Sequence, residues 1–274
     1  MREAVEWSAG RPVAGHLVID YQADTAAYSG RKKEAWSLSQ RAATVARGEN
    51  ENESAAKYLA RAALRDAELE SPATALEHAD AALKLFPSRD VKILVALAEG
   101  RAGDTTRAEN IVHELVLAYP SDTMLNFYWI PAVRAAVALH RNHGADAIDI
   151  LQVTTPYELG QPLQMGPATL YPVYVRGEAY LQLGQTGRAA TEFQKLLDHP
   201  GCVMNFLLGA LAHLGLARAN ALQARTSQGA DADAARVRAL AAYKDFLALW
   251  KDADPDIPIL KQAKAEYARL SGTS

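Results

Sequence analysis

Pairs of small residues twelve positions apart recur along this chain of 274 residues and restrict how it can fold. Two helices approach closely only where small side chains lie at their contact, so a fixed offset indicates a repeated pair of helices. The pairs are Ala23 with Ala35, Ala63 with Ala75, Ala96 with Ala108, Ala135 with Ala147, and Gly177 with Ala189. The pattern therefore predicts helix pairs packed one on the next.

A sixth pair, Gly215 with Ala239, has twice that offset. The surplus coincides with the polar stretch 224–233, which we interpret as a loop insertion between the two helices. From one first helix to the next, the small residues are 40, 33, 39, 42 and 38 positions apart. These steps are close to the period of about 34 residues that is typical of tetratricopeptide (TPR) repeats, lengthened by longer connections.

Glycines and prolines fall where such a repeat needs turns and helix ends. Gly30, Gly103 and Gly184 each follow a first-helix small residue by seven positions, where a residue free to adopt positive φ is required. Pro87 and Pro120 close two of the second helices, because proline cannot continue the backbone hydrogen bonding of a helix.

These patterns, with alanine frequent and β-branched runs scarce, predict an all-α fold. We expect a right-handed α-α superhelix, a TPR-like solenoid of about six helix pairs, ended by a capping helix with one polar face over residues 255–270. The whole chain, 1–274, would form this single domain. The expected units are 14–48, 51–87, 88–120, 121–156, 168–200 and 203–252.

The beginning of the chain differs from its end. Residues 1–10 suggest a short helical piece without a partner helix and without the polar face of a cap. We therefore expect the chain to be the C-terminal part of a longer protein.

Composition excludes several classes of function. A net charge of -3 gives no basic excess for a phosphate backbone, so we expect no nucleic-acid binding by this segment. The most apolar stretch, 203–216, is too short and too polar for membrane insertion. The single cysteine, Cys202, cannot form an internal disulfide and leaves the compartment open. We favour a cytoplasmic localisation. The alternative is an extracytoplasmic one, if the chain is attached to a membrane-anchored kinase.

Several phrases resemble the C-terminal TPR region of bacterial eukaryotic-type serine/threonine kinases or of winged-helix transcriptional regulators. They are residues 127–131 (FYWIP), 156–160 (PYELG), 209–218 (GALAHLGLAR) and 245–261 (DFLALWKDADPDIPILK). The resemblance implies a sensor or docking tail. Glycine-rich, His-Arg-Asp and Asp-Phe-Gly motifs are missing, so kinase activity would belong to a separate N-terminal domain.

The concave face of such a solenoid is lined by first-helix residues, and the repeat register selects the inward positions. The candidate binding residues are Asp20, Asp24, Tyr28, Trp129, His140, Tyr171, Tyr174, Glu178, Gln182 and Asn220. Aromatic side chains at these positions give a bound peptide rigid contact area. The alternative is that Trp129 and the tyrosines fill gaps between neighbouring helices. A carboxylate clamp of Lys, Arg and Asn is not present at these positions.

Two groups of residues resemble metal ligands only superficially. His140 and His143 share a helix face but lack the glutamate of a zinc-protease helix, and a polar helix end explains them better. Asp252, Asp254 and Asp256 alternate like calcium ligands, but the chain continues into Ile257 without the required glycine and distal glutamate. We interpret one of them as the cap of the final helix, with Pro255 or Pro258 at its start.

We therefore expect a protein-protein interaction scaffold whose partner is a protein or peptide, with no catalytic residue, no metal and no cofactor. A second hypothesis is a small-ligand receptor module that regulates an attached kinase or DNA-binding domain. It rests on the aromatic inward positions and on segment 154–169 as a lid or pocket wall.

Overall fold

The computed structural model describes residues 12–160 and 170–272, and the expected helical piece at residues 1–10 lies outside them. The structure is 82% helical, and no strand occurs in the described ranges. The prediction of an all-α fold is confirmed.

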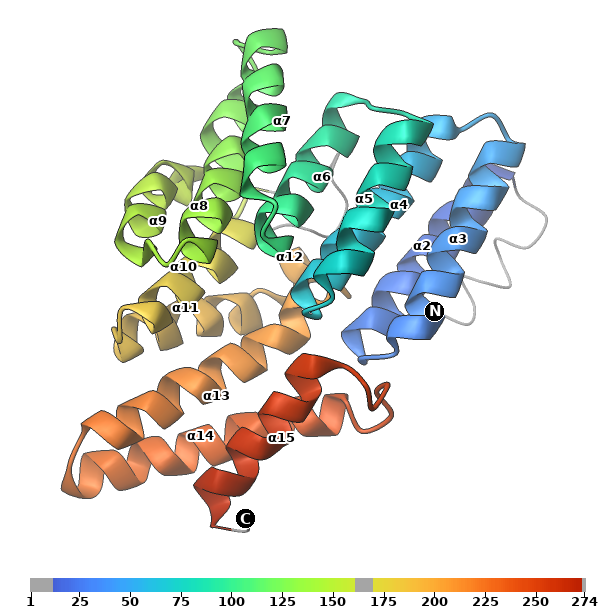
Figure 1. Ribbon diagram of the computed structural model, residues 1–274. Coiled ribbons are helices and arrows are strands. Elements are labelled where there is room, and N and C mark those ends of the chain that lie inside the picture. The colour runs from blue at the N-terminus through green and yellow to red at the C-terminus, as the bar shows by residue number, and fades with distance from the viewer. Residues whose placement is uncertain (1–11, 161–169, 273–274) are drawn as a thin grey trace.

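Most helices follow one another as antiparallel pairs joined by short turns (Figure 1). The first five pairs are α2 (Pro12–Tyr28) with α3 (Lys32–Gly48), α4 (Asn52–Glu68) with α5 (Pro72–Leu85), α6 (Arg89–Ala102) with α7 (Thr105–Ala118), α8 (Ile130–His140) with α9 (Gly144–Leu151), and α10 (Tyr171–Gln182) with α11 (Thr186–Asp198). The short α12 (Pro200–Val203), the long pair α13 (Leu208–Thr226) and α14 (Gly229–Leu249), and α15 (Pro258–Ser271) follow.

Each helix packs on its neighbour in sequence, and the first helices of successive pairs also pack on one another from α4 through α6, α8 and α10 to α13. In Figure 1 the pairs from α2 to α7 stand side by side, while α13 and α14 cross below them. The first helices thus form an inner layer, and the second helices lie outside it.

The small residues of the twelve-residue pattern are all buried, including Gly177 and Gly215. Gly30, Gly103 and Gly184 adopt φ of 73°, 98° and 69°, as predicted for the turns between paired helices. The helices α5 and α7 end shortly before Pro87 and Pro120, again as predicted. Local backbone requirements therefore define the boundaries of these pairs.

The predicted loop insertion at 224–233 is wrong. Both helices extend instead, to 19 residues in α13 and 21 in α14, and only Ser227 and Gln228 separate them. The stretch is rich in alanine, a strong helix former, and Asp231 lies in the first turn of α14, where its charge favours the helix dipole.

A π-helical turn, Leu125–Trp129, precedes α8. Pro131 follows it within the first turn of α8 and lacks the amide hydrogen that a regular helix would use. The distortion has an identifiable cause in the sequence.

The row of pairs closes on itself. Trp250 donates its indole N–H to the carbonyl oxygen of Tyr28 at 3.0 Å, although the two lie 222 positions apart. The side-chain amide of Asn205 donates to the carbonyl oxygen of Tyr21 at 2.7 Å. Helices α2 and α13 are also in contact. The first pair therefore packs against the last one.

The aspartates before α15 contribute to this closure and do not cap the helix, which corrects the sequence interpretation. Asp254 accepts a hydrogen bond from the backbone amide of Lys33 at 2.9 Å and donates its own amide to the carbonyl of Gly30 at 3.0 Å. Asp256 pairs with the Lys33 ammonium at 3.2 Å. The N-cap of α15 is Ile257, and Pro258 starts the helix as expected.

One apolar core runs from Ala56 to Ala263, but α2 and α3 contribute to separate, smaller clusters. Between α2 and α4 the contact is charged: Asp20 pairs with Arg61, and Asp24 pairs with Arg65, with all four side chains buried. Buried ion pairs demand a defined geometry because a lone buried charge is costly. They fix how the first pair sits on the second.

Candidate functional site

A cavity of about 390 Å³ lies where five first helices and α15 converge; we call it the central cavity. Helices α4, α6, α8, α10 and α13 and the final α15 all contribute to its lining. The lining residues are Ala67, Glu68, Glu70, Arg101, Ala136, Leu139, His140, Tyr174, Glu178, Leu181, Gln182, Arg218 and Ile259.

Its floor is a charged group centred on Arg101. The guanidinium donates to both carboxylate oxygens of Glu68, at 2.6 Å from Nε and 2.9 Å from Nη2. It also contacts Glu178, with 2.7 Å between Nη1 and Oε2. The Tyr171 hydroxyl donates to Glu68. Each member of the floor is therefore oriented by another.

Burial and neighbouring charges shift the titration of the floor. Burial raises the pKa of Glu178, opposed by the positive charge of Arg101. Burial lowers the pKa of Arg101, but the carboxylates Glu178 and Glu68 more than offset this and raise it well above its ordinary value. Arg101 therefore stays charged at any physiological pH.

Aromatic and apolar groups complete the walls. The Arg101 guanidinium carbon lies 5.8 Å from the ring centroid of Tyr174, a cation-π arrangement. Leu139, Leu181 and Ile259 supply apolar surface around the charged floor. The cavity therefore combines a charged floor with apolar sides.

Helix α15 is tied to the rim by polar contacts. Arg218 donates from Nε to Glu266 at 3.0 Å and from Nη2 to Gln262 at 3.2 Å. Gln262 in turn donates to Glu70 at 2.7 Å. The closing helix thus fixes one side of the cavity, and Arg218 is partly exposed at its edge.

Four of the ten predicted binding residues line the central cavity: His140, Tyr174, Glu178 and Gln182. A fifth, Tyr171, contacts the cavity through Glu68. His140 and Gln182 are exposed at the rim. The structure brings these five together and distributes the other five elsewhere.

Asp20 and Asp24 are not exposed on any concave face, which corrects the sequence prediction. Both are 0% exposed and belong to the charged contact between α2 and α4. Burial raises the pKa of Asp24 to about 6, although the positive charge of Arg65 opposes this shift. Burial also lowers the pKa of Arg61 to about 9. All four charged side chains are buried, so this contact holds the two helices together and has a high desolvation cost.

Tyr28, Trp129 and Asn220 also lie away from the cavity. Tyr28 takes part in the closure between the first and last pairs. Trp129 is 3% exposed and packs edge-on against Tyr128, the packing alternative that the sequence left open. Asn220 accepts a hydrogen bond from Arg238 of α14 at 2.9 Å, in a separate groove.

Sequence reasoning missed Glu68, Arg101 and Arg218. A signal for the first two was present: Glu68, Arg101, His140 and Gln182 each follow the small residue of their first helix by five positions. All four line the cavity. Arg218 breaks this register, and its place at the rim depends on α15.

Within the described ranges, no group of three or more histidine, cysteine, aspartate or glutamate side chains could hold a metal ion. His140 ends α8 and His143 is the N-cap of α9, as the sequence interpretation placed them. In the same ranges no helix is long and apolar enough to cross a membrane. Comparisons with protein-family models and with curated proteins find no match for this chain.

Proposed function

We propose that this chain is a binding module of TPR-like helix pairs arranged as a right-handed superhelix, and that its partner is a protein or peptide segment seated at the central cavity. The observation that carries the proposal is the convergence of six helices, far apart in sequence, on one preformed hollow. Such convergence is costly to build, because it requires buried charges to be paired in a defined geometry.

The shape of the cavity favours a side chain inserted from an extended segment. Its volume of about 390 Å³ suits one anchoring side chain with the adjoining backbone. The rim residues His140, Gln182 and Arg218 carry polar groups that suit hydrogen bonding to that backbone. A preformed site of this kind spares the entropy of ordering its own side chains on binding.

We further propose that the module serves as a docking or sensor tail of a larger bacterial signalling protein. The support is the resemblance of phrases such as residues 245–261 to the repeat region of bacterial kinases and regulators. In this proposal the catalytic or DNA-binding activity belongs to another domain. The slight net negative charge of -3 supports a protein partner over a nucleic acid.

Selection of peptides from a random display library against the wild-type chain tests the peptide-binding proposal. Selected peptides should bind Gln182→Ala and Arg218→Ala variants at least tenfold more weakly by calorimetry, because both side chains lie at the rim. Val237→Ala, on an exposed position of α14, serves as the control. Selected peptides that bind all three variants equally well would overturn the proposal.

A small-ligand receptor is the second candidate, favoured by a cavity volume within the range of small-molecule sites. The lid argument is weakened, because residues 154–160 do not line the central cavity, and residues 161–169 lie outside the described ranges. Glu158 instead ties this segment to Arg176 at 2.7 Å and Lys195 at 2.6 Å. A metabolite that raises the melting temperature of the wild type but not of Gln182→Ala would favour this candidate.

A further inference from the structure

A second cavity, of about 520 Å³, lies between α3, α5 and the segment that leads into α15. We call it the Trp36 cavity, after the indole that lines it. Asp254 and Asp256 form one wall, so the cavity exists because the last part of the chain returns to the first two helix pairs. It is separate from the central cavity, with which it shares no lining residue.

Trp36 and His78 form a stacked pair in this cavity. Their ring centroids are 3.5 Å apart and the planes differ by 16°. The Nδ1 atom of His78 lies 2.7 Å from Oδ2 of Asp66, and both side chains are buried. Because an ionised carboxylate only accepts hydrogen bonds, Nδ1 of His78 carries a hydrogen and donates a hydrogen bond to Asp66. In the neutral imidazole, Nε2 is therefore an acceptor.

The two lysines of the cavity are already paired within the protein. The Lys32 ammonium donates to Ser71 at 2.7 Å and pairs with Asp66 at 3.4 Å. Lys33 pairs with Asp256 at 3.2 Å. An anionic ligand would have to compete with these carboxylates for the two ammonium groups.

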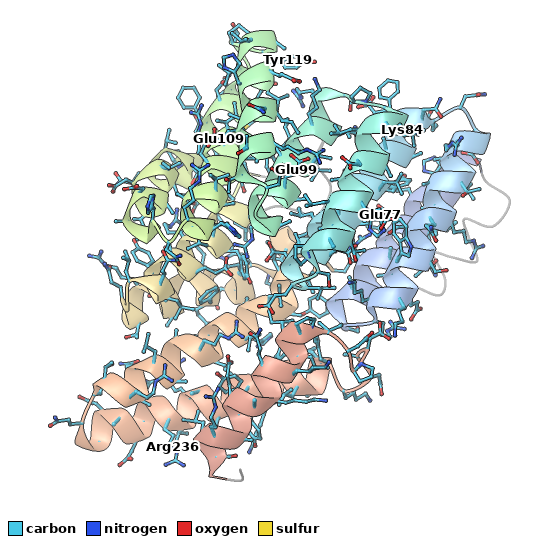
Figure 2. All side chains as sticks on the ribbon, in the orientation of Figure 1. Glu77, Lys84, Glu99, Glu109, Tyr119 and Arg236 are labelled. Carbon is cyan, nitrogen blue, oxygen red and sulfur yellow. The ribbon has the colours of Figure 1, made fainter. Side chains whose placement is uncertain are left out.

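The acceptors, in contrast, are in excess. Nε2 of His78, which is 5% exposed, makes no hydrogen bond to any described residue. Glu77 makes no ion pair within the described ranges and lies on α5 (Figure 2). It is one of the residues that line the cavity. Asp254 uses Oδ2 for the Lys33 amide and retains Oδ1. The lining contains four carboxylates and two lysines, so these side chains together carry a net negative charge.

From this arrangement we propose that the Trp36 cavity binds a basic group, the guanidinium of arginine or an alkyl ammonium. Carboxylates beside an acceptor nitrogen are a favourable setting for such a cation, and the indole edge at the cavity wall offers apolar surface to its alkyl stem. The cation would donate to Glu77, to Nε2 of His78 and to Oδ1 of Asp254. The two lysine pairs need not be displaced.

Calorimetric titration with three probes tests the proposal: N-acetyl-argininamide, agmatine, and N-acetyl-norleucinamide as the uncharged analogue. Both basic probes should bind saturably and the norleucine compound should not. A fourth probe, an arginine-containing pentapeptide, identifies the source of the cation: if agmatine binds as tightly as this peptide, the natural ligand is a small amine. If the pentapeptide binds at least tenfold more tightly, the ligand is a protein segment. In either case the site recognises a cation.

Two variants locate the binding. Glu77→Gln keeps the size of an exposed side chain, so the fold should be unaffected, and it should weaken both basic probes at least fivefold. Glu109→Gln, on α7 and outside the cavity, is the matched control and should bind as the wild type does. The absence of saturable binding by any basic probe, or equal binding by Glu77→Gln, would overturn the proposal. Because the central cavity is separate, neither result bears on the peptide site.

Discussion

The ring of Phe193 lies against the backbone of Gly215: a Cβ atom placed on Gly215 would come within 2.5 Å of Cε1 of that ring. Gly177, on the other neighbouring first helix, approaches the same ring, with 2.9 Å for its own hypothetical Cβ. Two of the small residues that define the repeat thus share one large aromatic side chain. Close approach of the helices here depends on the absence of side chains at both positions.

Gly215→Ala should therefore destabilise the protein by about 1–3 kcal/mol, even though alanine is the better helix former. The overpacked methyl group has to displace a buried ring. Urea unfolding monitored by circular dichroism measures the change. In a double-mutant cycle with Phe193→Leu, the two losses should be less than additive, since the smaller side chain makes room for the methyl group. Strict additivity would contradict this contact.

Gly30→Ala should cost more stability than Gly184→Ala. Both positions have positive φ, at 73° and 69°, which costs an alanine roughly 1 kcal/mol. At Gly184 the added Cβ meets open space, but at Gly30 it would lie 2.5 Å from Cβ of Ala253 and 2.8 Å from the Trp250 ring. The difference between the two variants therefore isolates the closure between the first and last pairs.

We expect a further loss of about 1–3 kcal/mol for Gly30→Ala, together with an increased radius of gyration in small-angle scattering. Equal melting temperatures for the two variants would show that the closure contributes nothing to stability.

Glu99 should make stability fall as pH rises through neutrality. This carboxyl group is 0% exposed, and burial raises its pKa to about 7, although Arg107 opposes the shift. In the unfolded chain the same group releases its proton near 4.5. Its stabilising contribution is therefore complete below about 4.5 and is lost as pH rises through about 7.

Glu99→Gln should remove this part of the pH dependence and raise the free energy of unfolding at pH 8 by roughly 1–3 kcal/mol. Glu109→Gln, on the partly exposed surface of α7, should not. Chemical unfolding at pH 5 and pH 8 gives both values. If stability changes between pH 5 and pH 8 by the same amount in the wild type, in Glu99→Gln and in Glu109→Gln, the assignment to Glu99 is wrong.

Replacing Arg101 with methionine should destabilise the protein by about 3–5 kcal/mol, because Glu68 and Glu178 would lose their shared counter-charge. Adding Glu68→Gln should recover part of that loss, since one of the uncompensated charges is then removed. Arg188→Met, at an exposed position of α11, is the control and should change stability little. Thermal unfolding of the wild type and these three variants shows whether the ion pairs of Arg101 contribute to stability.

The sequence predicted the turn glycines and the buried small residues correctly because these are local requirements. A turn at Gly103 needs positive φ whatever lies elsewhere in the chain, and Ala96 and Ala108 are both buried on two helices joined by a short connection. The loop at 224–233 was missed because an offset between two small residues does not distinguish an insertion from two longer helices.

The candidate site was only partly predictable. The register identified His140 and Gln182, and the same position in earlier helices would have added Glu68 and Arg101. The register could not show that Asp24 is enclosed by a neighbouring helix, because its partner Arg65 is 41 positions away. Pairing across helices depends on their relative rotation, which periodicity does not encode.

By itself, the sequence determined that the chain is helical, where its turns lie and which small residues are buried, because each of these depends on backbone geometry over a few turns of helix. Only the tertiary structure decided that the row of pairs closes, with Trp250 bonded to Tyr28, and that two cavities result. The physical reason is that closure depends on the summed rotations between all successive pairs. Each rotation depends on packing details that no single repeat contains.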